Sequence, residues 1–238
     1  MADPIRVLVV SAHPDDIEFG CAGSVARWVD EGHQVAYVIV TDGSTGTADA
    51  ELAGSRLAEI RREESLAAAK IVGVEDVIFL GYRDGYVEPT LDLRRDIARE
   101  FRKFKPHRLI TMDPQPIPGG WFVNHPDHRA IGQATLDITV TAGTTPGHFP
   151  ELLEEGFEAW KGLRDIYLFG PGGGEHAEDI SSAIDRKVDA LKAHHSQVGD
   201  WDVEPMLRGW MKLNGEQHGM DAAELFQVLQ TMEARRET

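Results

Sequence analysis

The chain has 238 residues, of which 42% are hydrophobic and 27% are charged, as in an ordinary globular protein. Its formal net charge of −16 disfavours DNA and anionic membranes as partners and favours a small molecule. The single cysteine, Cys21, rules out an intramolecular disulfide, and no apolar stretch reaches the roughly 18 residues of a membrane span. The opening MADPIRVLVV does not resemble a signal peptide, so we expect a cytoplasmic protein that binds neither nucleic acid nor membrane.

The predicted elements alternate between strand and helix over the first 169 residues. The strands are rich in valine and isoleucine and mostly continuous in hydrophobicity, which is typical of strands covered on both faces. In chain order we predict strand 5–11, helix 22–31, strand 34–41, helix 53–72, strand 77–80, helix 91–104, strand 108–112, helix 129–141 and strand 165–169. Residues 143–162 are interpreted as a surface excursion and residues 169–179 as a mobile loop, followed by helices at 181–195 and 221–236.

This alternation predicts an α/β fold with one domain over residues 1–238. We expect a three-layer, Rossmann-like arrangement in which a mostly parallel sheet carries helices on both faces. In the strand order 3-2-1-4-5 the first and fourth strands are neighbours, and ligands bind beyond their carboxyl ends. The segments that follow these two strands should therefore face each other.

Both of those segments contain acids and histidines, in HPDD at 13–16 and HPDH at 125–128. Two imidazoles and one carboxylate leave coordination positions open for water and substrate, as in catalytic zinc sites. A tight turn can aim His13 and Asp16 at one ion. Either His125 or His128 can supply the third ligand. Asp15 would then be free to act as a base towards water that the ion activates.

The motifs AHPDDIEFG and HPDHRAIG resemble those of the LmbE-like, or PIG-L, superfamily of zinc-dependent N-deacetylases. Weaker similarities extend over nearly the whole chain: TDGSTGT after the second strand, IRREESLAAAKIVGV at 60–74, KVDALKAHHSQ at 187–197 and AAELFQVL near the end. Many members have HPDDE, whereas here Ile17 stands before Glu18. This departure bears on the subfamily rather than on the metal site.

The resemblance implies a role for each polar residue of the two motifs. It implies a Zn²⁺ ion, or another divalent metal, held by His13, Asp16 and His128. Asp15 corresponds to the general base of the family. His125 corresponds to the histidine that stabilises the oxyanion, and Asp127 to the carboxylate that orients it.

The resemblance also implies an N-acetylglucosamine-type conjugate as substrate and a possible homo-oligomer, a trimer or a hexamer. Arg61 and His194 are candidate substrate-binding residues, with a solvated helix face as the alternative for Arg61. Trp121 and Phe122, between the two motifs, could stack on a sugar ring or anchor their loop.

Four other functions are alternatives to a zinc-dependent deacetylase. An iron oxygenase could use His13 and Asp15 with a distant histidine, but the oxygenases with this spacing usually have β-sandwich folds. A dinucleotide-binding protein needs G-x-G-x-x-G after the first strand, where this chain has HPDD. An amidase acting on a thiol-sugar conjugate and a non-catalytic sugar- or metal-binding protein remain open alternatives.

Overall fold

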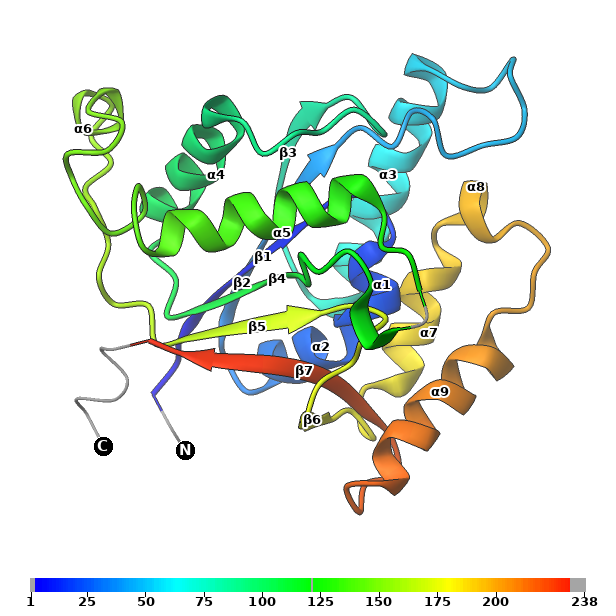
Figure 1. Cartoon of the computed structure of the whole chain (residues 1–238). Helices are drawn as coiled ribbons and strands as arrows, with labels where there is room; N and C mark the ends of the chain where they lie inside the picture. Colours follow the sequence, from blue (N-terminus) through cyan, green and yellow to red (C-terminus); the bar gives the residue numbers. More distant parts are fainter. Residues whose placement is uncertain (1–2, 121, 232–238) are drawn as a thin grey trace.

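The computed structural model describes residues 3–120 and 122–231 (Figure 1). Within these ranges seven strands form one sheet of order β3-β2-β1-β4-β5-β7-β6. The strands are β1 (Arg6–Ser11), β2 (Gln34–Thr41), β3 (Asp76–Tyr82), β4 (Arg108–Met112), β5 (Asp165–Phe169), β6 (His176–Asp179) and β7 (Ala223–Gln230). The longer helices are α2 (Ala22–Asp30), α3 (Ser55–Val72), α4 (Leu91–Phe104), α5 (Pro126–Thr139), α7 (Ile184–Lys192) and α9 (Glu204–Glu216). The short ones are α1 (Asp16–Gly20), α6 (Glu151–Glu154), α8 (His195–Val198) and a 3₁₀ turn at Pro118–Gly120.

The sheet is parallel from β3 through β5, and the predicted order 3-2-1-4-5 is confirmed. β7 then pairs antiparallel with β5, and β6 pairs antiparallel with β7. Because β1 lies between β2 and β4, its carboxyl end is beside that of β4. The topology therefore brings the two motif-bearing segments to one edge of the sheet.

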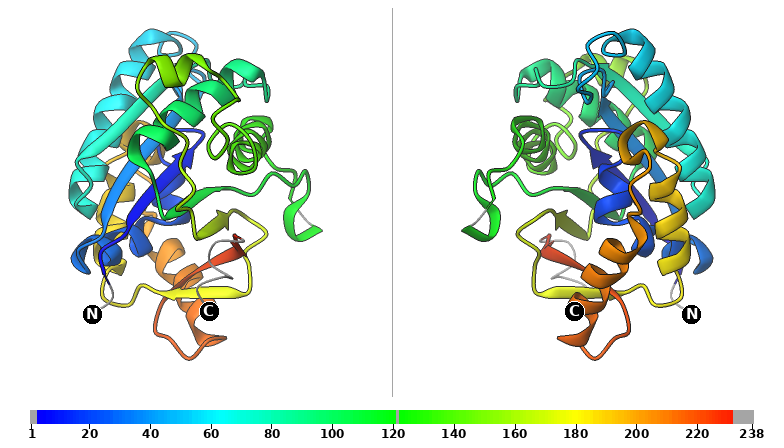
Figure 2. Two further views of the ribbon diagram at one scale, coloured as in Figure 1. Left: turned by 90° about the vertical axis from the view of Figure 1, so that its left-hand side faces the viewer. Right: turned by 90° about the vertical axis from the view of Figure 1, so that its right-hand side faces the viewer.

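Helices cover both faces of the sheet, which confirms the three-layer prediction (Figure 2). Alternate residues of β1 point to opposite faces, because side chains of a strand alternate. Val7 and Val9 pack with α2, α3 and α7, whereas Leu8 and Val10 pack with α4 and α5. The two hydrophobic cores explain why the strands are apolar along their whole length. Among the described residues, no helix is both long and apolar enough to cross a membrane.

The prediction of a terminal helix at 221–236 is wrong over residues 223–230, which form β7; residues 232–236 lie outside the described residues. AAELFQVLQ has good helix formers, but tertiary packing overrides propensity here. The chain pairs with the exposed edge of β5, and Phe226 packs against Trp28 and Tyr167. The mobile-loop prediction for 169–179 is also corrected, because residues 176–179 form β6.

Other differences concern the helix limits. Helix α5 begins at Pro126, three residues before the predicted start, and α7 ends at Lys192, before His194. The sequence reading predicted neither α1 nor α9. That residues 1–238 form one domain stays a prediction.

A fully buried ion pair joins β7 to the helical layer. The Lys187 Nζ atom of α7 lies 2.6 Å from Glu224 Oε1 of β7, and both side chains are completely buried. Glu224 also accepts hydrogen bonds from the backbone N–H groups of Gly23 and Ser24, at 3.0 and 2.7 Å. The carboxylate therefore ties α2, α7 and β7 together.

We expect Lys187→Ala to destabilise the fold, because it leaves a buried carboxylate without its counter-charge. Breaking a buried pair in this way costs about 3–5 kcal/mol of unfolding free energy. Urea denaturation measures the loss, with Lys192→Ala as the control, since Lys192 pairs with Glu204 at the surface. If Lys187→Ala lost no more stability than the control, Glu224 would not need its partner.

Candidate active site

The HPDD segment forms a tight turn between β1 and α1. The Asp16 carboxylate accepts a hydrogen bond from the His13 backbone N–H at 2.6 Å, and the Phe19 N–H donates to the Asp15 carbonyl at 3.1 Å. Asp15 has a φ of 102°, in the left-handed region that non-glycine residues rarely adopt. The turn thereby separates the side chains of the two adjacent aspartates.

The HPDH segment forms the start of α5. His125 is the N-cap residue, and its Nδ1 accepts a hydrogen bond from the Asp127 backbone N–H at 3.2 Å. Because Nδ1 is the acceptor, the neutral ring carries its proton on Nε2. His128 lies one turn into the helix, so its ring is on the side of His125; the two ring centroids are 5.3 Å apart.

Three of the predicted residues converge at this edge of the sheet. His13 Nδ1 lies 3.2 Å from His128 Nε2 and 3.3 Å from Asp16 Oδ2. Asp16 Oδ1 lies 3.2 Å from His128 Nε2. Ligand atoms about 2.0–2.2 Å from a tetrahedral ion are roughly 3.3–3.6 Å from one another. These side chains are therefore close to the separations that zinc ligands need.

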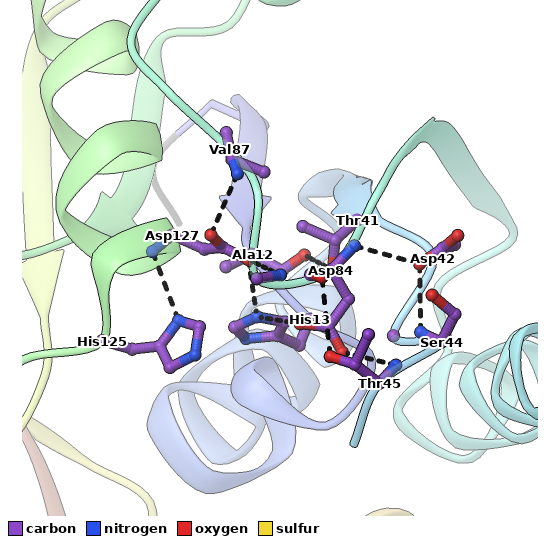
Figure 3. Close-up of polar contacts among 12 residues, drawn as sticks. Ala12, His13, Thr41, Asp42, Ser44, Thr45, Asp84, Val87, His125 and Asp127 are labelled. Carbon is purple, nitrogen blue, oxygen red and sulfur yellow. Dashed lines mark hydrogen bonds and ion pairs between the residues drawn. The ribbon is translucent and has the colours of Figure 1, made fainter. Parts of the chain in front are cut away.

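The other nitrogen of His13 faces two carboxylates (Figure 3). His13 Nε2 lies 3.1 Å from Asp84 Oδ1 and 3.2 Å from Asp127 Oδ2. Asp127 is completely buried and also accepts hydrogen bonds from the backbone N–H groups of Gly85 and Val87, at 2.7 and 3.2 Å. A proton on Nε2 satisfies these acceptors and leaves the Nδ1 lone pair available for a metal.

Two further triplets could hold a metal, since their donor atoms lie within 4.8 Å of one another: His13 with His125 and His128, and His13 with Asp84 and Asp127. In the second triplet both oxygens of Asp127 accept hydrogen bonds from backbone N–H groups, whereas Asp16 accepts such a bond at Oδ2 and keeps Oδ1 free of backbone donors. In the first, His125 Nδ1 accepts a hydrogen bond. Both arrangements therefore have fewer free donor atoms than His13, Asp16 and His128.

The electrostatics of the cluster favour a cation. Burial opposes a charge on His13, but Asp16, together with hydrogen bonds to Asp127 and Asp84, raises the His13 pKa to about 12. Burial and the neighbouring His13 lower the pKa of His125, so this ring is neutral near pH 7. The same carboxylates that hold a proton on His13 attract a divalent ion, which competes with protons for its ligands.

Asp15 lies beside these residues but contacts a different partner. Its Oδ2 is 3.2 Å from Arg61 Nη2, which also donates to the Pro14 carbonyl at 2.5 Å. Burial raises the pKa of Asp15 to about 7, against the opposing effect of Arg61. A carboxylate with a pKa near neutrality can accept a proton and later return it.

The two predicted substrate-binding residues are buried. Arg61 is 3% exposed, so the alternative of a solvated helix face is wrong for it. His194 is fully buried between α7 and α8, with its Nε2 atom 3.1 Å from Glu18 Oε2. Direct contact of either residue with substrate stays a prediction. Trp121 lies outside the described residues.

Asp127 and Asp84 differ from the expectations drawn from the sequence. The resemblance implied that the Asp127 carboxylate orients His125, but the described contact to that ring comes from its backbone N–H, and the carboxylate faces His13. Sequence reasoning missed Asp84. Its signal was an acid four residues after the end of the predicted strand 77–80, at the same edge of the sheet.

We expect Asp84→Asn to weaken metal binding without unfolding the protein. The amide removes one of the two charges that fix the His13 ring, and loss of such a supporting partner typically costs 10–100-fold in affinity. Competition titration with Zn²⁺ measures the change. Asp92→Asn, at an exposed position of α4, is the matched control. Wild-type affinity in Asp84→Asn would contradict a supporting role for Asp84.

Two deacetylases are similar to this chain over most of its length. Diacetylchitobiose deacetylase of Thermococcus kodakarensis is 31% identical over 225 residues, which cover 93% of this chain and 82% of that protein. The 1D-myo-inositol 2-acetamido-2-deoxy-alpha-D-glucopyranoside deacetylase of Kineococcus radiotolerans is 31% identical over 255 residues, covering 82% of this chain and 69% of that protein.

A solved structure is similar over most of the chain. N,N'-diacetylchitobiose deacetylase from Pyrococcus horikoshii, in complex with its inhibitor MPG, matches with a TM-score of 0.88 and 31% identity, covering 96% of this chain and 85% of that one. The family model described as GlcNAc-PI de-N-acetylase, PIG-L, matches residues 8–139, more than half of the chain. The match includes both motifs and the helices and strands between them, and it confirms the resemblance seen in the sequence: this chain belongs to the PIG-L family of deacetylases.

Proposed function

We propose that this protein is a zinc-dependent N-deacetylase that removes the acetyl group from an N-acetylglucosamine-type conjugate. The observation that carries the proposal is the convergence of His13, Asp16 and His128, with Asp15 beside them and outside the ligand set. Two imidazoles and a carboxylate suit zinc and leave positions free for water and a substrate oxygen. Membership of a deacetylase family supports an amide as the bond that is cleaved.

A divalent ion in this position supplies positive charge that polarises an amide carbonyl and lowers the pKa of water to about 7. Asp15 accepts the proton of the attacking water. His125 donates its Nε2–H to the carbonyl oxygen as that oxygen becomes negative, a contribution typically worth about 3–4 kcal/mol. Asp15 then gives its proton to the nitrogen of the leaving amine, so that acetate and a free amino sugar result.

The charges around the site bear on the choice of substrate. The carboxylates of Asp16, Asp84 and Asp127 surround His13, and the whole chain has a net charge of −16. The nearby cation, Arg61, is engaged with Asp15 and backbone carbonyls. A neutral N-acetylated saccharide avoids the repulsion that an anionic conjugate meets, so we place neutral substrates ahead of acidic ones. A cytoplasmic location and a trimer or hexamer stay predictions from the sequence.

We expect Asp15→Asn to keep the metal and lose turnover. Asparagine has the same shape and tolerates positive φ, but it cannot take a proton from water. Loss of a general base lowers kcat about 10²–10⁴-fold. Amine release by fluorescamine and zinc content by mass spectrometry give the two readouts, with Asp30→Asn as the surface control. Unaltered turnover with full zinc content would remove Asp15 from the mechanism.

The function itself is tested by amine release from a panel of amides, with and without a chelator. The panel holds N,N'-diacetylchitobiose, N-acetylglucosaminyl inositol, the acidic malate conjugate and a thiol-sugar amide. We expect release from the neutral sugars, loss of that release on chelation and recovery with Zn²⁺. Chelator-resistant release would contradict the metal. Release from the thiol conjugate alone would favour the amidase alternative, and none from any member would favour a non-catalytic binding protein.

A further inference from the structure

The side chain of Asn124 ties the start of α5 to the end of β4. Its Nδ2 atom donates to the backbone carbonyl of Asp113 at 2.7 Å and to that of Gln115 at 3.1 Å. The backbone N–H of Asn124 donates to the Pro116 carbonyl at 3.0 Å. The residue before α5 is therefore bonded to the residues that follow β4, and Asn124 is only 2% exposed in this closure.

The side-chain amide of Asn124 serves as a donor alone. Its Oδ1 atom is buried and has no hydrogen-bond partner among the described residues. A buried acceptor that stays unpaired costs stability. The benefit of this residue must therefore come from its two side-chain N–H groups, which hold two ends of the chain together.

Asn124 directly precedes His125, the N-cap residue of α5. The ring of His125 meets the ring of His13 edge to face, with 4.7 Å between the two centroids. Because β4 pairs with β1 and His13 follows β1, the end of β4 is fixed relative to His13. The hydrogen bonds of Asn124 fix His125 to that same strand end.

A second contact holds the body of α5 independently of Asn124. A Cβ atom on Gly132 would lie 2.4 Å from the backbone oxygen of Met112, so the helix packs directly on the backbone of β4. His128 lies in the helix between Asn124 and Gly132. Loss of the Asn124 side chain therefore frees the entry to the helix at His125 and leaves His128 held by the helix.

We propose that Asn124 is a positioning residue: its two side-chain hydrogen bonds hold His125 where the Nε2–H of that ring meets the carbonyl oxygen of the substrate. This inference rests on the proposed function in taking His125 as the donor to that oxygen. The hydrogen bond strengthens as the oxygen becomes negative, so its displacement lowers kcat rather than raising KM. A misplacement of about 1 Å can cost roughly 100-fold in rate.

Two substitutions separate the hydrogen bonds from the shape of the side chain. Asn124→Ala removes the amide, whereas Asn124→Leu keeps a similar size without any donor. We expect kcat to fall about 10–100-fold in both, with KM within about threefold of wild type. Asn214→Ala is the matched control, because its Nδ2 also donates to a backbone carbonyl, that of Ala223, but from α9. Wild-type kcat in Asn124→Leu would overturn the proposal.

A double-mutant cycle with His125→Ala distinguishes positioning from a general loss of structure. If Asn124 acts through His125, Asn124→Leu should lower kcat no further once the His125 ring is absent. An equal fall in kcat in both backgrounds would overturn the proposal, because the effect would then not pass through His125.

A structural test needs no substrate. In a crystal structure of zinc-loaded Asn124→Leu we expect the His125 ring to leave its contact with His13, while Asp16 and His128 stay on the ion. An unmoved His125 would overturn the inference even if the enzyme is an active deacetylase. A displaced His125 would support it even if no amide of the panel is cleaved, so failure of the inference and failure of the proposed function are distinguishable.

Discussion

The candidate site depends on one imidazole that faces two chemically different environments. His13 presents Nε2 to the carboxylates of Asp84 and Asp127, and Nδ1 to Asp16 and His128. Because the acceptors hold a proton on Nε2, a metal ion that displaces the proton from Nδ1 finds that nitrogen directed at the ligand set. A ring without acceptors on Nε2 could adopt either tautomer, and the ligand set would be incomplete for part of the time.

The fold supplies the partners of that ring from remote parts of the chain. His13 follows β1 in the chain. Asp127 and His128 lie in α5, which follows the neighbouring strand β4. The loop after β3 contributes Asp84 and fastens itself to Asp127 through the backbone N–H groups of Gly85 and Val87. Asp127 therefore connects α5, this loop and β1, and its position decides where the ring of His13 can lie.

The sequence predicted the parts of this arrangement that depend on local patterns. The strands are continuously apolar, and the HPDD and HPDH motifs follow two strands that are neighbours in the predicted order. From these patterns the sequence predicted that His13, Asp16 and His128 lie close together. Asp84 was not predicted as a site residue, because an acid in the sequence RDG at 83–85 is equally typical of a turn. The burial of Arg61 could not be predicted, since it depends on the loop 43–46 folding over it. The terminal strand was missed because its residues favour helix locally and pair with β5 only in the folded chain.

The most direct measurement of the central claim is the anomalous X-ray scattering of zinc in crystals of the metal-loaded protein. It locates the ion relative to the two nitrogens of His13 without assuming any activity. We predict an ion bonded to His13 Nδ1, Asp16 and His128 Nε2, with Nε2 of His13 still on Asp84 and Asp127. An ion on the opposite side of the ring, among His13 Nε2, Asp84 and Asp127, would contradict the account.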